Sequence, residues 1–375
     1  MRIEGVEALV VPIALRDPVQ SAGITHADKT TLFLRLVTDE AVGWGECAAY
    51  PGARAPDPTI GALEPAVVDR LVGRMCAAVS GGPLEASSVV AACGPRTAGE
   101  RTLAAALEMA ALDIELRREH RSLAAFVGAT RSEVKSGTVV GIPVNRDIGA
   151  LMDAVDSAVG HGFGRVRLKI EPGWDHQPLH AVRERWPDLM LQADANGSFV
   201  PGDESELQGL DAYDLACLEQ PFAADALDAH RELATSMATP IALDESLWSL
   251  ERVESAVVSG ACAVACLKPG RLGGVMAAVA AARACARSGV DCFVGGFFES
   301  GLGRAVNAAV AGRDEFGLPG DLGDPDRYLE ANPIAYLPCQ GGMVTLSGGP
   351  GLGVEVREER LRLPESRSRW ISAPS

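Results

Sequence analysis

Five short apolar runs between residues 165 and 270 each close on a charged residue, and they recur at a nearly constant interval. The charged residues are Lys169, Asp194, Glu219, Asp244 and Lys268. Their separations are 25, 25, 25 and 24 positions, and a period of about 25 fits one βα unit of strand, loop, helix and return. In a parallel barrel the carboxyl ends of all strands meet at one face, where active sites lie. The pattern therefore predicts one pocket that contains all five charges.

Length and composition fit an enzyme of two domains. The 375 residues suffice for a barrel of roughly 250 residues and a second domain. The net charge of −16 argues against nucleic acid and against an anionic membrane surface as partners. No apolar run approaches the roughly 18 residues of a membrane span, and the first residues lack a signal-peptide pattern. Cys262 and Cys266 fit small buried residues in a reducing compartment, so we expect a cytoplasmic protein.

Periodicity predicts an α+β region before the barrel. Strand-like alternation covers residues 1–12, 31–38 and 42–48, and helical patterns follow at about 60–78 and 99–119. The small and polar residues of 17–29 suggest a mobile loop. The barrel is expected to begin with a strand at 136–142. Helical patterns between its strands are expected near 147–160, 177–186, 225–238, 249–259 and 273–288.

Asp194, Glu219 and Asp244 close three successive strands of the predicted barrel. Three carboxylates that meet within a few ångströms do not all stay ionised unless a cation compensates them. Oxygen ligands suit hard ions, and no histidine closes a strand, so we expect Mg²⁺, with Mn²⁺ as a possible substitute. The alternative, in which each carboxylate pairs with an arginine or lysine at the rim, rarely produces equal spacing on three strands.

Lys169 and Lys268 flank the three carboxylates along the chain. A lysine near a divalent cation and a second positive charge has a lowered pKa, which suits a general base. Two lysines on opposite walls of a site can address opposite faces of one carbon. The predicted chemistry is loss of a proton α to a carboxylate, with the metal stabilising the enediolate. The alternative for each lysine is a salt bridge to the acidic cluster.

Neighbouring polar residues are weaker candidates. Arg167 precedes Lys169 by two positions and points to the same side, so it suits carboxylate binding, lowering of the lysine pKa, or a purely structural role. Asn196 and Glu245 lie close to proposed ligands in the sequence. Side chains at such positions are suited to hold the ligands of a metal in place. Glu299 follows an apolar strand and precedes a glycine-rich turn, a position that suits a polar pocket contact.

These motifs resemble the enolase superfamily, muconate-lactonizing subgroup. The site pieces read RLK (167–169), DAN (194–196), EQP (219–221), DES (244–246) and KPGRLGG (268–274). The resemblance covers nearly the whole chain, including GWGEC (43–47), KIEPGWD (169–175), GGFFESGLGRAVN (295–307), LPGD (318–321) and GPGLGV (349–354). KIEPGWD and Arg271, three residues after Lys268, are typical of the branch of o-succinylbenzoate synthases and N-succinylamino acid racemases.

The resemblance implies an α/β fold, namely a modified TIM barrel, (β/α)7β, with an α+β capping domain. We place the capping domain at residues 1–125, the barrel at 126–330, and a segment returning to the capping domain at 331–375. It also implies that the three carboxylates bind Mg²⁺, that Lys169 and Lys268 are acid and base, and that the substrate is a small carboxylate. A synthase would serve menaquinone biosynthesis. A homo-oligomer is expected, as in relatives.

Four departures from the family pattern bear on the substrate. Arg167 replaces a lysine, Val139 stands where relatives often have serine, Phe297 stands where methionine is common, and AAYPGARAPDP (48–58) replaces the usual loop. Dehydration and racemisation use the same residues, and Arg271 favours racemisation. The alternatives are a cycloisomerase or a dipeptide epimerase, for which Glu299 alone is weak support, and a non-catalytic protein with this fold.

Overall fold

The computed structural model describes residues 2–21, 24–51, 62–79 and 85–373. Its largest sheet has seven parallel strands in the order β13-β12-β11-β10-β9-β8-β7. The strands are β7 (Thr138–Val140), β8 (Arg165–Lys169), β9 (Met190–Asp194), β10 (Cys217–Glu219), β11 (Ile241–Leu243), β12 (Val264–Leu267) and β13 (Asp291–Val294). β10, β11 and β12 are buried throughout, as expected for parallel strands covered on both faces.

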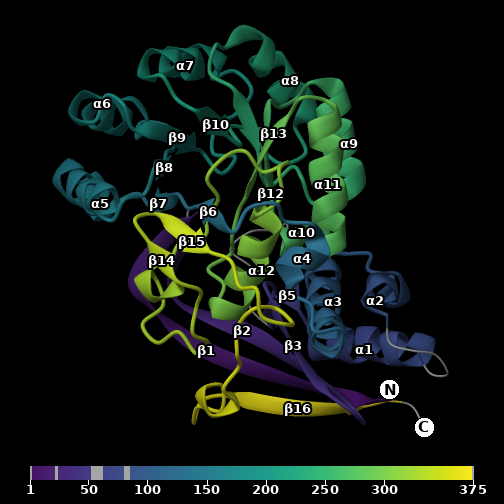
Figure 1. The fold of residues 1–375 in the computed structure, drawn as a ribbon. Coiled ribbons are helices and arrows are strands. Elements are labelled where there is room, and N and C mark those ends of the chain that lie inside the picture. Colours follow the sequence, from purple (N-terminus) through teal and green to yellow (C-terminus); the bar gives the residue numbers. More distant parts are fainter. Residues whose placement is uncertain (1, 22–23, 52–61, 80–84, 374–375) are drawn as a thin grey trace.

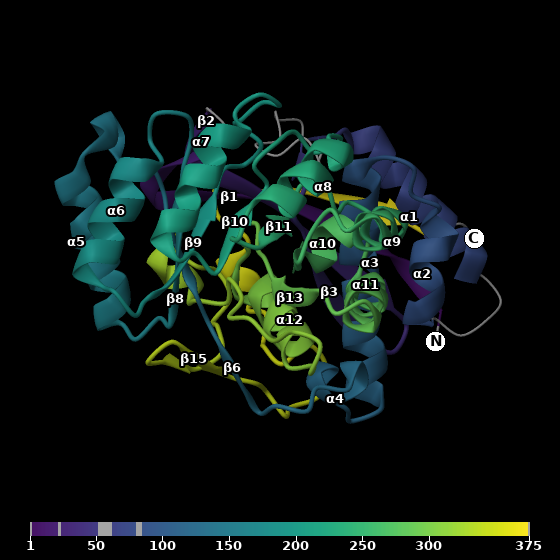
Figure 2. The ribbon, with the colours of Figure 1, turned by 90° about the horizontal axis from the view of Figure 1, so that it is seen from above.

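Helices surround these strands when the barrel is seen from above (Figure 2). They are α5 (Ile148–Gly160), α6 (His176–Arg185), α7 (Glu204–Gln208), α8 (Leu227–Ser236), α9 (Leu250–Ser259), α10 (Pro269–Leu272), α11 (Val275–Arg287) and α12 (Gly301–Ala311). The sequence predicted α5, α6, α8, α9 and α11 to within about two residues at each end. Among the described helices, none is long and apolar enough to cross a membrane.

The seven-stranded sheet closes through the segment that follows α12. The Asp321 N–H donates to the Val294 carbonyl over 2.8 Å, and the Gly137 N–H donates to the Gly320 carbonyl over 2.8 Å. Residues 318–321 therefore lie between the end of β13 and the residues before β7, in the place of an eighth strand. The predicted (β/α)7β barrel is confirmed.

A second, antiparallel sheet combines both ends of the chain. Its order is β16-β1-β2-β3, and Figure 1 shows β16 (yellow) alongside β1 (purple). The strands are β1 (Ile3–Ser21), β2 (Ile24–Thr38), β3 (Val42–Cys47) and β16 (Arg367–Ser372). The helices of this region are α1 (Pro65–Val79), α2 (Ala86–Cys93), α3 (Ala98–Arg118) and α4 (Leu123–Val127). Short strands are β4 (Tyr50–Pro51), β5 (Ala62–Leu63), β6 (Glu133–Lys135), β14 (Cys339–Gln340) and β15 (Met343–Thr345).

Two glycines of the GWGEC motif let α3 pack directly on β3. A Cβ atom on Gly43 would lie 2.1 Å from the Ala110 carbonyl oxygen, and one on Gly45 would lie 1.9 Å from that of Ala106. Real Cβ atoms do not approach oxygens so closely, so only glycine permits this contact between backbones.

Some sequence expectations need correction. The predicted loop at 17–29 is wrong for the described backbone, because β1 and β2 continue as a hairpin in which Val19 pairs with His26. Small and polar side chains do not prevent such pairing, since the backbone supplies the hydrogen bonds. Helix α2 was not predicted. Positions 52–58 of the altered loop and the start of the helical pattern at 60–61 lie outside the described residues.

Candidate active site

Strand register brings three of the five charges to one level of the barrel. Lys169 lies opposite Asp194 between β8 and β9, and Asp194 lies opposite Glu219 between β9 and β10. Asp244 directly follows β11, and Lys268 directly follows β12. Because parallel strands end at the same face of the barrel, the side chains gather there as the 25-residue period predicts.

Each lysine is hydrogen-bonded to a carboxylate at one end of this row. Lys169 Nζ donates to Asp194 Oδ2 over 2.6 Å and to Asn196 Oδ1 over 2.6 Å. Lys268 Nζ donates to Asp244 Oδ2 over 2.7 Å. The two amines therefore stand at opposite ends of the carboxylate row, with Glu219 between them in strand order.

Glu219 is fully buried, and its carboxylate accepts hydrogen bonds from Arg167. Nη1 of Arg167 donates to both Glu219 oxygens, over 2.8 and 2.6 Å, while Nη2 donates to Asp321. Gln192 also donates to Glu219. Burial raises the pKa of Glu219 to about 8; the charge of Arg167 opposes this, and those of Asp194 and Asp244 add to it. Arg167 is thus buried among carboxylates with its guanidinium engaged.

Asp244 is held by two cations. Arg271 Nη1 donates to the Asp244 carbonyl over 2.7 Å and also to its carboxylate. Burial favours a higher pKa for Asp244, but Arg271 and Lys268 outweigh it and hold this pKa well below its ordinary value. Burial favours a lower pKa for Lys268, yet the Asp244 carboxylate raises that pKa above its ordinary value. The lowered lysine pKa expected from the sequence refers to a lysine beside a bound divalent cation, and it stays a prediction.

The remaining sequence candidates occupy different places. The Phe297 ring centroid lies 4.4 Å from Lys268 Nζ. Asn196 Nδ2 donates to Glu245 Oε1 over 3.0 Å, which joins the loops after β9 and β11. Glu299 is buried, where its Oε1 accepts from Asn307 over 3.0 Å and its Oε2 lies 3.5 Å from Arg304 Nε. Val139 lies in β7, half-buried and opposite Arg167 in register.

Sequence reasoning missed several residues that support the site. Gln192 and Cys266 precede Asp194 and Lys268 by two positions, so the period of two along a strand could have placed them on the same side. Gln220, with a left-handed φ of +40°, accepts from the Asp244 N–H over 3.0 Å. Asp321 is brought in by the closing segment 318–321, and local pattern contains no signal for its contact with Arg167.

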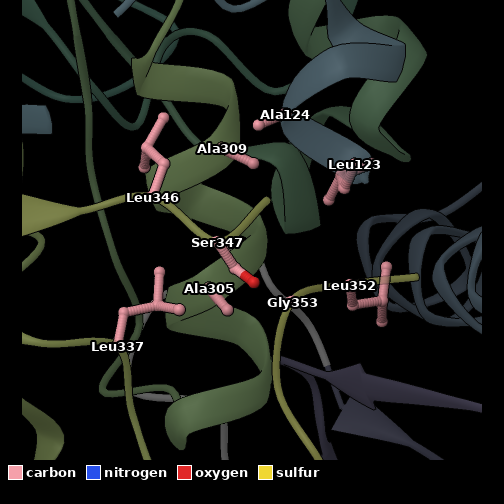
Figure 3. A pocket seen from close by; sticks show the side chains of 9 residues that line it. All are labelled: Leu123, Ala124, Ala305, Ala309, Leu337, Leu346, Ser347, Leu352 and Gly353. Atoms are coloured by element: carbon pink, nitrogen blue, oxygen red, sulfur yellow. The ribbon is translucent and has the colours of Figure 1, made fainter. Parts of the chain in front are cut away.

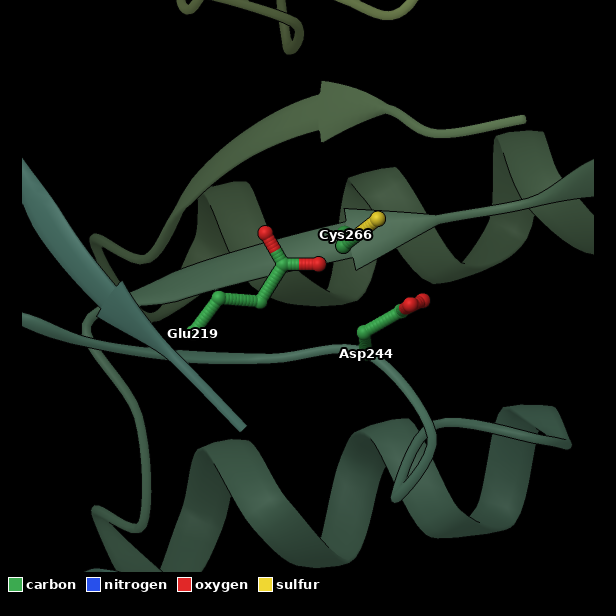
Figure 4. A group of neighbouring side chains, drawn as sticks. All are labelled: Glu219, Asp244 and Cys266. Carbon is green, nitrogen blue, oxygen red and sulfur yellow. The ribbon is translucent and has the colours of Figure 1, made fainter. Parts of the chain in front are cut away.

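The carboxylates suit a hard divalent cation. Among the described residues, Glu219, Asp244 and Cys266 bring one donor atom each within 4.8 Å of one another, and Figure 4 shows their side chains converging. Burial raises the pKa of the Cys266 thiol well above its ordinary value, so it stays protonated and is a poor ligand for a hard ion. Asp194 is outside this group: its Oδ2 accepts a hydrogen bond from Lys169, and its backbone lies opposite Glu219 in register.

A small apolar crevice shares no residue with this site. It lies between α4, α12 and the C-terminal segment, and Figure 3 shows Leu123, Ala309 and Leu346 among its walls. Its lining contains no ionisable side chain, so it cannot perform acid–base chemistry.

Comparison with known proteins agrees with this architecture. Residues 4–128 match the N-terminal domain of the mandelate racemase / muconate lactonizing enzyme family, and residues 150–360 match the enolase C-terminal domain-like family. An N-succinylamino acid racemase from Amycolatopsis is 37% identical over 374 residues, covering 100% of both chains. An o-succinylbenzoate synthase from Bacillus subtilis (strain 168) is 32% identical over 364 residues, covering 96% of each.

The fold has a close counterpart among solved structures. An enolase superfamily member from Listeria innocua superimposes with a TM-score of 0.91 at 29% identity, covering 100% of both chains. The chain therefore belongs to the enolase superfamily, in the mandelate racemase / muconate lactonizing enzyme family and the branch of o-succinylbenzoate synthases and N-succinylamino acid racemases.

Proposed function

We propose that this enzyme removes the proton α to a carboxylate of a small substrate, as an N-succinylamino acid racemase, an o-succinylbenzoate synthase, or both. One observation carries the proposal: two lysines stand at opposite ends of a row of three carboxylates, Lys169 on Asp194 and Lys268 on Asp244. Such a pair can take a proton from one face of a carbon and return one to the other.

Asp194, Glu219 and Asp244 would hold Mg²⁺, with Mn²⁺ as a possible substitute. When bound, the ion supplies positive charge beside the substrate carboxylate and so stabilises the enediolate. The burial of Glu219 on the strand between those that lead to Asp194 and Asp244 supports this assignment, since neighbouring buried carboxylates are stable as anions only next to compensating charge.

In a racemase, the neutral amine of one lysine takes the α-proton, and the ammonium of the other gives a proton to the opposite face. In a synthase, Lys169 takes the α-proton and assists loss of water, while Lys268 steadies the enediolate. The racemase reaction is our first choice, because Arg271, which favours racemisation in the family resemblance, is present and is hydrogen-bonded to Asp244, the partner of Lys268. The synthase reaction would place the protein in menaquinone biosynthesis.

Exchange of the α-proton tests the proposal. The protein is incubated with Mg²⁺ in D₂O and a panel of single-enantiomer N-succinyl and N-acetyl amino acids, and the α-proton signals are followed by NMR. For a racemase, we expect both the α-proton signal and the optical rotation of the sample to disappear. If no member exchanges and the o-succinylbenzoate precursor is not dehydrated, the proposal is wrong.

The alternative of a dipeptide epimerase loses its sequence support. Its weak support is Glu299 alone, and this residue is buried and engaged by Asn307 and Arg304. Dipeptides in the same NMR panel test this alternative directly.

We also propose a cytoplasmic homo-oligomer. All nine cysteines are free, and eight of them are buried, which fits a reducing compartment. Light scattering after size-exclusion chromatography would determine the oligomeric state.

A further inference from the structure

Lysine is rare in this chain. Of the 34 basic residues, four are lysines, at positions 29, 135, 169 and 268, and the other 30 are arginines. Lys135 is exposed, whereas Lys169 and Lys268 belong to the site. Lys29 is buried, with 1% of its surface exposed. A compact ammonium with three donors differs chemically from a planar guanidinium, so a buried lysine in an arginine-rich chain points to a specific contact.

Lys29 extends from β2 of the antiparallel sheet to the turn between β13 and α12. Its Nζ donates to the Phe297 carbonyl over 2.8 Å and to the Phe298 carbonyl over 2.8 Å. Glu46 Oε1 lies 3.9 Å from the same Nζ and compensates its charge. A buried ammonium is costly without such partners, so this contact fixes the position of the turn.

Glu46, in β3, holds the other end of the same turn. Its Oε1 accepts from the Ser300 N–H over 2.9 Å, and its Oε2 accepts from the Ser300 hydroxyl over 2.7 Å and from the Gly303 N–H over 2.9 Å. Ser300 and Gly303 begin α12, where a negative charge is stabilising. Residues 297–303 are therefore held by two buried, opposite charges from the antiparallel sheet.

This turn places the Phe297 ring against the proposed acid–base group. The ring centroid lies 4.4 Å from Lys268 Nζ and 5.1 Å from Arg271 Cζ. The next residue, Phe298, has a φ of +57°, a left-handed conformation that a phenylalanine keeps only when its surroundings hold it. The hydrogen bonds from Lys29 fall on the two carbonyls that flank this strained position.

We propose that Lys29 is a positioning residue that acts on Lys268 through Phe297. By holding the backbone of Phe297 and Phe298, it keeps the ring against Lys268 and sets the geometry of proton transfer on that face of the substrate. The inference rests on the proposed function, in which the two lysines serve opposite faces. Lys169 bonds to Asp194 and Asn196 at the far end of the row, so it does not depend on Lys29.

The test measures α-proton exchange separately for each enantiomer of one N-succinyl amino acid in D₂O with Mg²⁺. Lys268→Ala first identifies the enantiomer whose exchange depends on Lys268. Lys29→Met then keeps the apolar stem and removes the donors. Misplacement of a reacting group by about 1 Å costs up to about 100-fold, so we expect a 10- to 100-fold loss for that enantiomer and less than about 3-fold for the other.

Two further variants make the result decisive. Lys135→Met, an equivalent change at an exposed lysine, should alter neither rate. If Lys29→Met does not fold, Phe297→Ala takes its place, because it removes the ring and leaves the acceptor carbonyl; the same one-sided loss is expected. Equal loss for both enantiomers in a folded variant overturns the inference and leaves Lys29 a purely structural residue. If the unaltered protein exchanges neither enantiomer of any N-succinyl amino acid, the racemase reaction itself has failed, and the inference falls with it.

Discussion

Lys268 Nζ lies 2.7 Å from Asp244 Oδ2, and both side chains are buried. A proposed acid–base group and a proposed metal ligand thus form one ion pair, which Arg271 extends on the other side of Asp244. Lys169 and Asp194 repeat the arrangement at the other end of the row. The site is therefore built from two lysine–carboxylate pairs around the buried Glu219.

Replacing Lys169 or Lys268 one at a time shows which face of the substrate each lysine serves. We expect Lys169→Ala and Lys268→Ala each to slow racemisation by about 10²- to 10⁴-fold, the usual contribution of a general acid or base. Each variant should keep α-proton exchange for one enantiomer only, and the two should keep opposite ones. Polarimetry and NMR in D₂O measure both quantities. Loss of exchange for the same enantiomer in both variants would contradict the assignment of opposite faces.

Removal of the metal should abolish activity. We expect a chelator to stop α-proton exchange, and Mg²⁺ or Mn²⁺ to restore it. Glu219→Gln should weaken Mg²⁺ binding at least about 10-fold, because it removes a buried anionic ligand. Titration calorimetry measures the affinity. Glu254→Gln, an exposed change on α9, is the control and should bind Mg²⁺ like the unaltered protein. Equal affinity in the two variants would remove Glu219 from the ligand set.

The close contact between α3 and β3 predicts a strong effect of a single methyl group. A Cβ at Gly45 would lie 1.9 Å from the Ala106 carbonyl oxygen, so Gly45→Ala must move the helix from the sheet. We expect a loss of at least about 1–3 kcal/mol in the free energy of unfolding. Gly73→Ala in α1 is the matched control: a Cβ there meets no atom within 4 Å, and the change should be neutral or stabilising. Urea unfolding compares them, and equal stability would refute the steric argument.

A buried carboxylate outside the site makes stability depend on pH. Glu108 in α3 accepts from the backbone N–H groups of Val275 and Met276 at the start of α11. Burial raises its pKa from 4.5 to about 7, although these hydrogen bonds oppose the shift. The folded state therefore binds an extra proton between these pH values. The contribution of this proton to the stability of the folded state is complete below about pH 4.5 and is lost as the pH rises through about 7.

Glu108→Gln should remove this dependence, because an amide does not titrate. From the shift in pKa, we expect the unaltered protein to lose about 3 kcal/mol more stability than the variant between pH 4.5 and pH 7.5. Urea unfolding at several pH values measures the difference. Glu119→Gln, exposed just beyond the same helix, should behave like the unaltered protein. Parallel pH profiles for Glu108→Gln and the unaltered protein would contradict the prediction.

Much of the site could be predicted because one period governs it. The five charges recur with the βα unit, and parallel strands end at one face, so the proximity of Lys169, Asp194, Glu219 and Asp244 follows from spacing alone. Gln192 was equally predictable from its position two residues before Asp194 but was overlooked. The direction in which the Glu299 side chain points was not predictable. It depends on the packing of α12 and on the contact with Arg304, and no local sequence pattern encodes either of these.

The sequence by itself determined the barrel, the position of the charged residues at the ends of its strands, and the family to which the chain belongs. These features depend on local periodicity and short motifs. Only the tertiary structure decided which charges pair, how the segment 318–321 closes the barrel, and that Lys29 supports the turn beside Lys268. Lys29 and Phe297 are 268 positions apart, and their contact exists only because the antiparallel sheet packs on the barrel. The physical reason is that backbone periodicity is set by neighbours along the chain, whereas burial and charge pairing are set by neighbours in space.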